Sequence, residues 1–115
     1  MKAWLAIAGL VGLIVCEGAM AEAMTYGLGT TTCGLFVTAA EEARAGQQYG
    51  IQAYMTWFSG YATMASGQSN IDYFKGTDTK SVQLWLENYC RANPLNTFNA
   101  AAVSAMVELH RKQKQ

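Results

Sequence analysis

The chain has 115 residues, of which 51% are hydrophobic and 14% charged, and its 8 acidic and 8 basic side chains cancel at neutral pH. A neutral chain without a basic stripe lacks the electrostatic footprint of a nucleic-acid-binding protein. The length is enough for one domain and not two.

The N-terminus has the pattern of a secretory signal peptide. Lys2 precedes an apolar run over residues 3–15, and the small residues that follow offer cleavage after Ala21 or, equally, after Ala23. The apolar run is shorter than the ~20 residues that a membrane span needs. We therefore expect residues 1–21 to be removed as a signal peptide and the protein to be periplasmic.

Cysteine usage agrees with export. Cys16 lies in the signal; in a second interpretation it is the acylated residue of a lipoprotein, although the bulky Val15 precedes it where small residues are usual. Cys33 and Cys90 remain in the exported chain, and two thiols in an oxidising compartment are expected to form one disulfide. A loop of this length gives about 4 kcal/mol in the chain-entropy model, a large contribution for a small core.

Helical periodicity begins after a short lead-in. Residues 22–31 are rich in Gly and Thr and are predicted to be flexible, whereas residues 32–115 form the domain. The first helix is predicted from Thr32 to the turn at Gly46. The second, over about residues 48–65, has a broad apolar face and few polar side chains, so it lies centrally in the bundle or reserves part of its face for a partner.

A loop is predicted to begin at residue 66 and to continue through residues 67–70 and beyond, and two further helices follow it. Asp78 is a suitable N-cap for the third helix, which Pro94 stops, and Thr97 or Asn96 can cap an alanine-rich fourth helix. No segment alternates with a period of two for long enough to predict a strand. The predicted fold is therefore all-α, a small four-helix bundle held by one disulfide.

No cluster of residues predicts catalysis or a cofactor. The single imidazole, His110, lies in a basic C-terminal tail, where a helix-end cation is the simpler interpretation. Asp72 and Asp78 flank Gly76 without the spacing of a calcium loop. The chain also has no CxxC or HxxxH spacing for zinc. We expect a protein that is not an enzyme and that needs no metal or cofactor.

Aromatic side chains are more numerous than a core of this size can hide completely. Most of them are expected to pack in the core, since Trp and Tyr are often half-buried. The remaining possibility is a protein-binding face, because such residues anchor protein interfaces. The candidates for this face are Trp57, Phe58, Tyr61, Trp85 and Tyr89.

The residues around both cysteines resemble the HdeA/HdeB family of small periplasmic proteins. Cys33 stands at the start of the first helix, and Cys90-Arg91-Ala92-Asn93-Pro94 matches the segment before the last, with Trp57–Tyr61 and Phe98 in support. The resemblance implies a single-disulfide helical bundle that forms homodimers at neutral pH and acts as an acid-stress chaperone, binding unfolded client proteins through apolar surface exposed in acid. The leading functional prediction is therefore a non-enzymatic, periplasmic, HdeA-like stress chaperone.

A second, weaker resemblance gives the alternative function. The Gly60-Tyr61 element in the second helix is similar to that of the Rap/Tai-type immunity proteins of type VI secretion, which are also exported helical bundles. Those proteins usually carry more cysteines than this pair. The alternative is an immunity or inhibitor protein that binds and neutralises one secreted toxin. Either function uses a protein partner.

Overall fold

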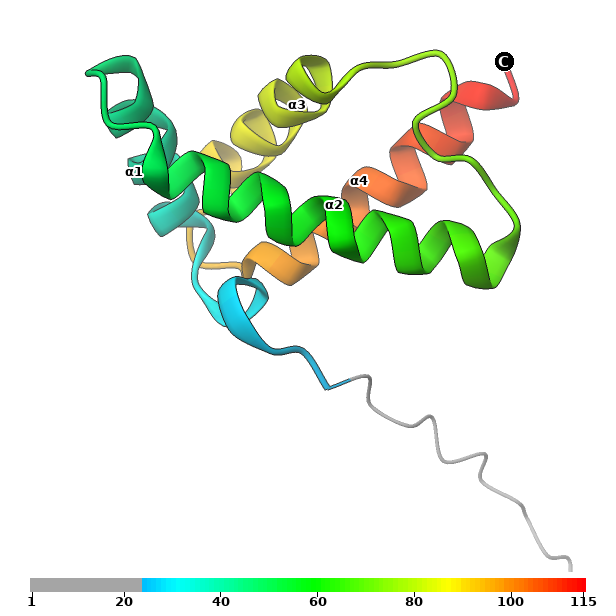
Figure 1. Ribbon diagram of the computed structural model, residues 1–115, viewed down its shortest axis with the longest axis horizontal. Coiled ribbons are helices and arrows are strands. Elements are labelled where there is room, and N and C mark those ends of the chain that lie inside the picture. Colours follow the sequence, from blue (N-terminus) through cyan, green and yellow to red (C-terminus); the bar gives the residue numbers. More distant parts are fainter. Residues whose placement is uncertain (1–23) are drawn as a thin grey trace, which may run out of the picture.

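The computed structural model describes residues 24–115, so the predicted signal peptide and Cys16 lie outside the described residues. Within that range the chain forms a short 3₁₀-helix and four α-helices and no β-strand (Figure 1). The elements are η1 (Gly27–Thr30), α1 (Cys33–Arg44), α2 (Tyr49–Ser69), α3 (Thr79–Ala92) and α4 (Phe98–Gln113). The predicted all-α, four-helix bundle with one disulfide is thus confirmed for the described residues.

Local capping explains where the helices begin and end. The Asp78 carboxylate accepts a hydrogen bond from the Ser81 amide at 2.8 Å, and the Thr97 hydroxyl accepts one from Ala100 at 3.1 Å. These are the predicted caps of α3 and α4. In contrast, α2 continues through residues 66–69, where the sequence predicts a loop. It ends only at Asn70, whose positive φ of 56° gives the left-handed turn that closes many helices.

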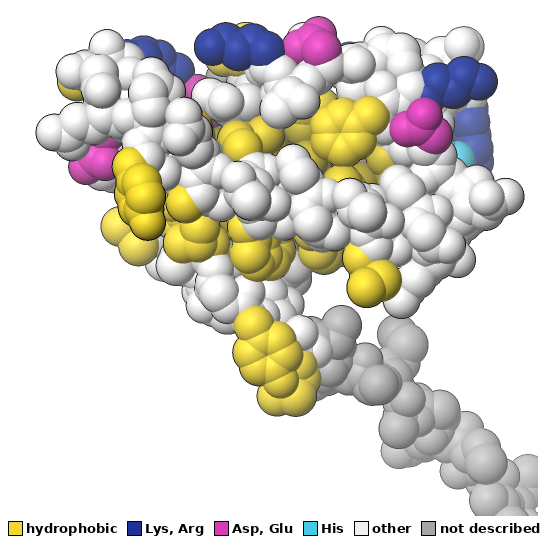
Figure 2. Space-filling model, in the orientation of Figure 1, with side chains coloured by type: hydrophobic (Ala, Val, Ile, Leu, Met, Phe, Trp, Pro, Cys, Tyr) yellow, Lys and Arg dark blue, Asp and Glu magenta, His cyan; other side chains and the backbone are white. Residues whose placement is uncertain are grey.

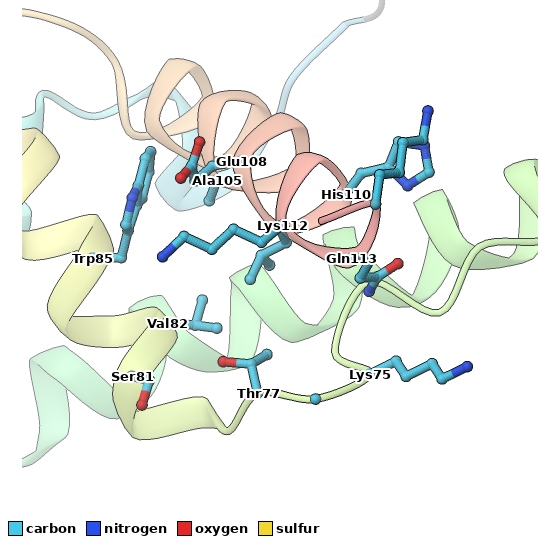
Figure 3. Close-up of a pocket in the computed structure, with 13 residues that line it drawn as sticks. Lys75, Thr77, Ser81, Val82, Trp85, Ala105, Glu108, His110, Lys112 and Gln113 are labelled. Carbon is cyan, nitrogen blue, oxygen red and sulfur yellow. The ribbon is translucent and has the colours of Figure 1, made fainter.

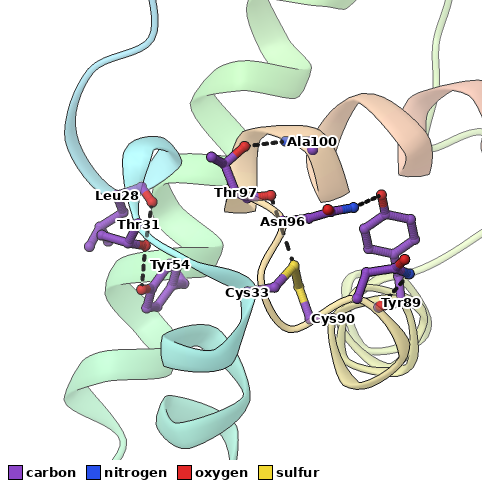
Figure 4. The surroundings of a disulfide bond; sticks show 10 residues. Leu28, Thr31, Cys33, Tyr54, Tyr89, Cys90, Asn96, Thr97 and Ala100 are labelled. Carbon is purple, nitrogen blue, oxygen red and sulfur yellow. Dashed lines mark hydrogen bonds between the residues drawn. A yellow bond between two sulfur atoms is a disulfide. The ribbon is translucent and has the colours of Figure 1, made fainter.

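The disulfide lies where three helix ends meet (Figure 4). Cys33 at the start of α1 is bonded to Cys90 in the last turn of α3, with their Cα atoms 4.8 Å apart. No side chain caps α1. Instead, its first two amides, those of Cys33 and Gly34, donate to the Asn96 and Pro94 carbonyls at 2.7 and 3.0 Å. The turn between α3 and α4 therefore completes the N-terminus of α1.

An aromatic cluster fills the core beside the disulfide. The rings of Phe36, Tyr54 and Phe98 lie 4.7 to 5.3 Å apart, in stacked and edge-to-face arrangements. The small side chains Ala101 and Ala105 on α4 are at most 1% exposed and let the other helices approach closely. The hydroxyl of Tyr54 shares a hydrogen bond of 2.7 Å with Thr31, so burial of this ring leaves no polar group unpaired.

The described part of the predicted flexible lead-in is packed against the bundle. Residues 27–30 form η1, which contacts both α2 and α4. Gly29 in this helix is buried because the ring of Trp57 covers it. This difference from the expected flexibility has a tertiary cause, since only a neighbouring helix could supply the covering ring.

Candidate functional site

The surface of α2 carries no charge. Residues 45–71, which include the whole helix, contain no Asp, Glu, Lys, Arg or His, and α4 has none before Glu108. In Figure 2 hydrophobic side chains follow the lower edge of α2, whereas charged side chains lie above the helix and toward its two ends. We define the uncharged face by its residues: Met24, Tyr26, Trp57, Gly60, Tyr61, Met64, Val103 and Val107.

A shallow hollow of about 550 Å³ lies within this face. Its walls come from residues 24–26, from α2 and from Asn99 and Val103 of α4. The space beside Gly60 is open, since a Cβ added there would meet nothing within 4 Å. Burial and then the neighbouring Tyr73 hydroxyl raise the pKa of Tyr61, so the Tyr61 hydroxyl stays protonated and the hollow stays neutral.

Trp57 is the fixed centre of the uncharged face. Its indole N–H donates to the Tyr26 carbonyl at 3.0 Å, which ties the N-terminal segment to α2. Its ring stacks on Tyr61 with 5.6 Å between centroids and leans on buried Phe98 at the same distance. The ring also covers Gly29, where an added Cβ would come within 2.2 Å of it. Contacts on several sides hold the Trp57–Tyr61 pair in one orientation.

Flexible aliphatic and thioether side chains surround this rigid pair. Met64 is 63% exposed, Val103 44% and Val107 66%. Met64 follows Gly60 by one helical turn and Val107 follows Val103 by one turn, so each lies on the side of its helix that lines the hollow. These residues combine rigid aromatic rings with adaptable apolar neighbours and include no charged side chain. This is the composition found at the centre of protein-binding surfaces.

The five predicted aromatic residues do not form one site. Trp57 and Tyr61 lie on the uncharged face, but Phe58 is completely buried and packs edge-to-face near Phe74, so it is not available to a partner. Trp85 and Tyr89 form a separate stacked pair on α3, with 5.6 Å between centroids.

The residues that sequence reasoning missed are the exposed apolar ones around the hollow. Met24, Tyr26, Met64, Val103 and Val107 were not among the predicted candidates. The absence of charge over residues 45–71 was the available signal for α2. On α4, Val103 and Val107 are spaced by four residues and fall off the alanine face that meets the core. That spacing marked a second apolar stripe on the helix.

A buried carboxylate joins α1 to α3 away from this face. Glu87 is only 2% exposed; it forms ion pairs with Arg44 at the end of α1 and, at 2.8 Å, with Arg91. Arg91 also pairs with Glu41 at 3.2 Å. Burial acts to raise the pKa of Glu87, but the hydrogen bonds and charges of Arg44 and Arg91 outweigh it and lower the pKa below its ordinary value.

Two of the three polar residues considered for catalysis make local hydrogen bonds. Asp78 caps α3, and the Asp72 carboxylate accepts a hydrogen bond from the Phe74 amide at 3.1 Å. The His110 ring lies edge-on to Tyr73, with 6.2 Å between centroids. Within residues 24–115 no three His, Cys, Asp or Glu side chains lie close enough together to hold a metal ion.

Comparisons with known protein families, with characterised proteins and with solved structures gave no match to this chain. The resemblances to the HdeA/HdeB and Rap/Tai-type families therefore remain predictions from the residues quoted above. None of the described helices combines the length and apolar character that crossing a membrane requires.

Proposed function

We propose that this domain is a non-enzymatic, periplasmic protein-binding domain that acts as a stress chaperone, with the uncharged face as its binding surface. The observation that carries the proposal is the uncharged face itself. The folded chain holds Trp57, Tyr61 and exposed Met64 and Val107 at its surface without a charged residue among them. Apolar segments of other proteins are the chemistry that complements such a surface.

Absence of charge favours many clients over one cognate toxin. Charged side chains at an interface give specificity, because a mismatched partner leaves like charges together or buries them unpaired. The uncharged face has no charged side chain to reject a mismatched partner. Met64 adds an adaptable thioether that adjusts to different contact shapes. An immunity protein would be expected to carry charges that select its toxin.

The Glu87 ion pairs support a response to acid. Because folding lowers the pKa of Glu87, protonation of this carboxyl in acid weakens the link between α1 and α3. The disulfide keeps the start of α1 joined to α3 while that link is lost. A loosened but tethered bundle would present more apolar surface to a client, in addition to the uncharged face.

The test is suppression of client aggregation by the purified protein at neutral pH and at about pH 2 to 3. We expect the wild-type protein to suppress aggregation, and the double variant Met64→Lys/Val107→Lys to lose most of this protection because charge enters the uncharged face. Leu95→Lys is the matched control, since Leu95 is 90% exposed in the turn before α4 and outside the face. Its protection should equal that of the wild type.

Two outcomes would contradict the proposal. If the wild-type protein gives no protection in molar excess at either pH, it is not a chaperone. If the face variant and the Leu95→Lys control protect equally, the uncharged face is not the binding surface. Affinity capture at both pH values separates the alternative, since an immunity protein would retain one tight partner, whereas a chaperone retains many weak clients.

A further inference from the structure

A separate cleft lies between α3 and α4, near the C-terminus of the domain. It encloses about 720 Å³, within the range of small-molecule sites, and shares no lining residue with the hollow on the uncharged face. In Figure 3, Trp85 and Val82 of α3 face Lys112 and Glu108 of α4 across the cleft, and Thr77 closes one end. The cleft is thus built by two helices and the loop that precedes α3.

The floor of the cleft is apolar and fixed. Val82 and Ala105 are 2% and 1% exposed and belong to the core, so the floor cannot shift freely. Trp85 forms one wall, and Tyr89 stacks against it with an angle of 17° between the ring planes. An apolar group of a ligand would gain contact with these side chains at little cost in ordering the protein.

The rim of the cleft is cationic. Lys75, Lys112 and Lys114 line it, and among the residues that the structure describes none of the three forms an ion pair. Glu108 is the acidic residue in the lining, and both of its oxygens accept hydrogen bonds from Arg111, at 2.9 and 2.6 Å. The hydrogen bonds and charge of Arg111, and then the charge of Lys112, lower the pKa of Glu108, so its negative charge is present and is paired mainly with Arg111.

We propose that this cleft binds a small amphipathic anion, specifically a medium-chain carboxylate. The carboxylate would pair with Lys112, whose side chain extends toward Trp85 in Figure 3, and the alkyl chain would lie along Trp85, Val82 and Ala105. Lysine ammonium groups free of ion pairs at the edge of an apolar floor complement both ends of such a molecule. This site is independent of the proposed protein binding.

The experiment is a titration of the ¹⁵N-labelled protein with decanoate, observed by NMR. The indole N–H signals of Trp85 and Trp57 report separately on the cleft and on the uncharged face. We expect saturable shifts of the Trp85 indole and of the amides around Lys112, and no shift of the Trp57 indole. Decanol, which has the same chain without the charge, should bind much more weakly.

Charge variants test the assigned headgroup contact. Lys112→Gln should weaken decanoate binding about three- to tenfold, the effect of removing one partly exposed ion pair. Lys80→Gln is the matched control, since Lys80 is an exposed lysine of α3 outside the lining, and it should leave the affinity unchanged. The proposal is overturned if no saturable shift occurs up to about 1 mM decanoate. It is also overturned if the Trp57 indole responds instead. The same holds if decanol binds as tightly as decanoate, or if Lys112→Gln binds decanoate as tightly as the wild type does.

Discussion

Replacing Glu87 by Gln is the sharpest test of how the bundle responds to acid. The substitution keeps the shape of the side chain but removes the negative charge that faces Arg44 and Arg91. Breaking a fully buried ion pair costs about 3 to 5 kcal/mol. Here the arginine side chains are 54% and 44% exposed, so water recovers part of the loss, and about 2 kcal/mol is the better expectation at neutral pH.

The pH dependence distinguishes charge from packing. Since folding lowers the pKa of Glu87 from its ordinary value of 4.5, its ion pairs stabilise the fold fully above that value and cease to do so as pH falls through the folded-state pKa. At pH 7 we expect the melting temperature of Glu87→Gln to lie about 8 to 16 °C below that of the wild type. At about pH 2 the two proteins should melt together, because both then lack the charge.

Circular dichroism melts across this pH range, with Glu108→Gln as the matched control, complete the experiment. Glu108 also pairs with an arginine and also has a lowered pKa, but its pair with Arg111 lies within α4 and joins no two helices. The control should leave the free energy of unfolding nearly unchanged, because solvent screens an exposed pair. A Glu87→Gln deficit that persists unchanged at about pH 2 would refute the electrostatic explanation and assign the loss to packing.

Two other substitutions test the structural devices of the fold. Reduction, or replacing Cys33 and Cys90 by Ser, should lower the free energy of unfolding by about 4 kcal/mol, and urea unfolding of the oxidised and reduced proteins measures this directly; equal midpoints would contradict the role of the bond. Gly29→Ala should cost about 1 to 3 kcal/mol and shift the fluorescence of Trp57, because the new Cβ would overlap the indole. Gly67→Ala, at a helix position where nothing lies within 4 Å, should instead stabilise by about 0.5 to 1 kcal/mol, and an equal loss in both variants would mean that the Trp57 contact is not the cause.

The two proposed sites differ in their exposure and in the effect that a bound ligand would have on the fold. The uncharged face is open, contains exposed residues from α2 and α4, and lies on the surface without any change in the native fold. The α3–α4 cleft has a fixed apolar floor with a cationic rim. At neutral pH a carboxylate bound there would bridge α3 and α4 and stabilise the native state by mass action.

Local sequence signals determined much of this protein. Asp78 and Thr97 predicted the caps of α3 and α4 because each cap depends on a side chain and an amide three residues away. Helical spacing of the apolar residues predicted the number of helices, and the two remaining cysteines predicted the bond between Cys33 and Cys90. These features follow from neighbours along the chain or from the number of available thiols.

Tertiary structure alone decided which apolar residues face solvent. Phe58 and Trp57 are adjacent aromatic residues on one helix, yet Phe58 points into the core and Trp57 lies over Gly29 at the surface. The order of the lead-in has the same origin, since Gly29 is covered only because α2 packs beside it. Composition and periodicity show that a side chain prefers burial, but which side chains are buried depends on how the helices are rotated against each other, and that rotation is set by contacts distant in sequence.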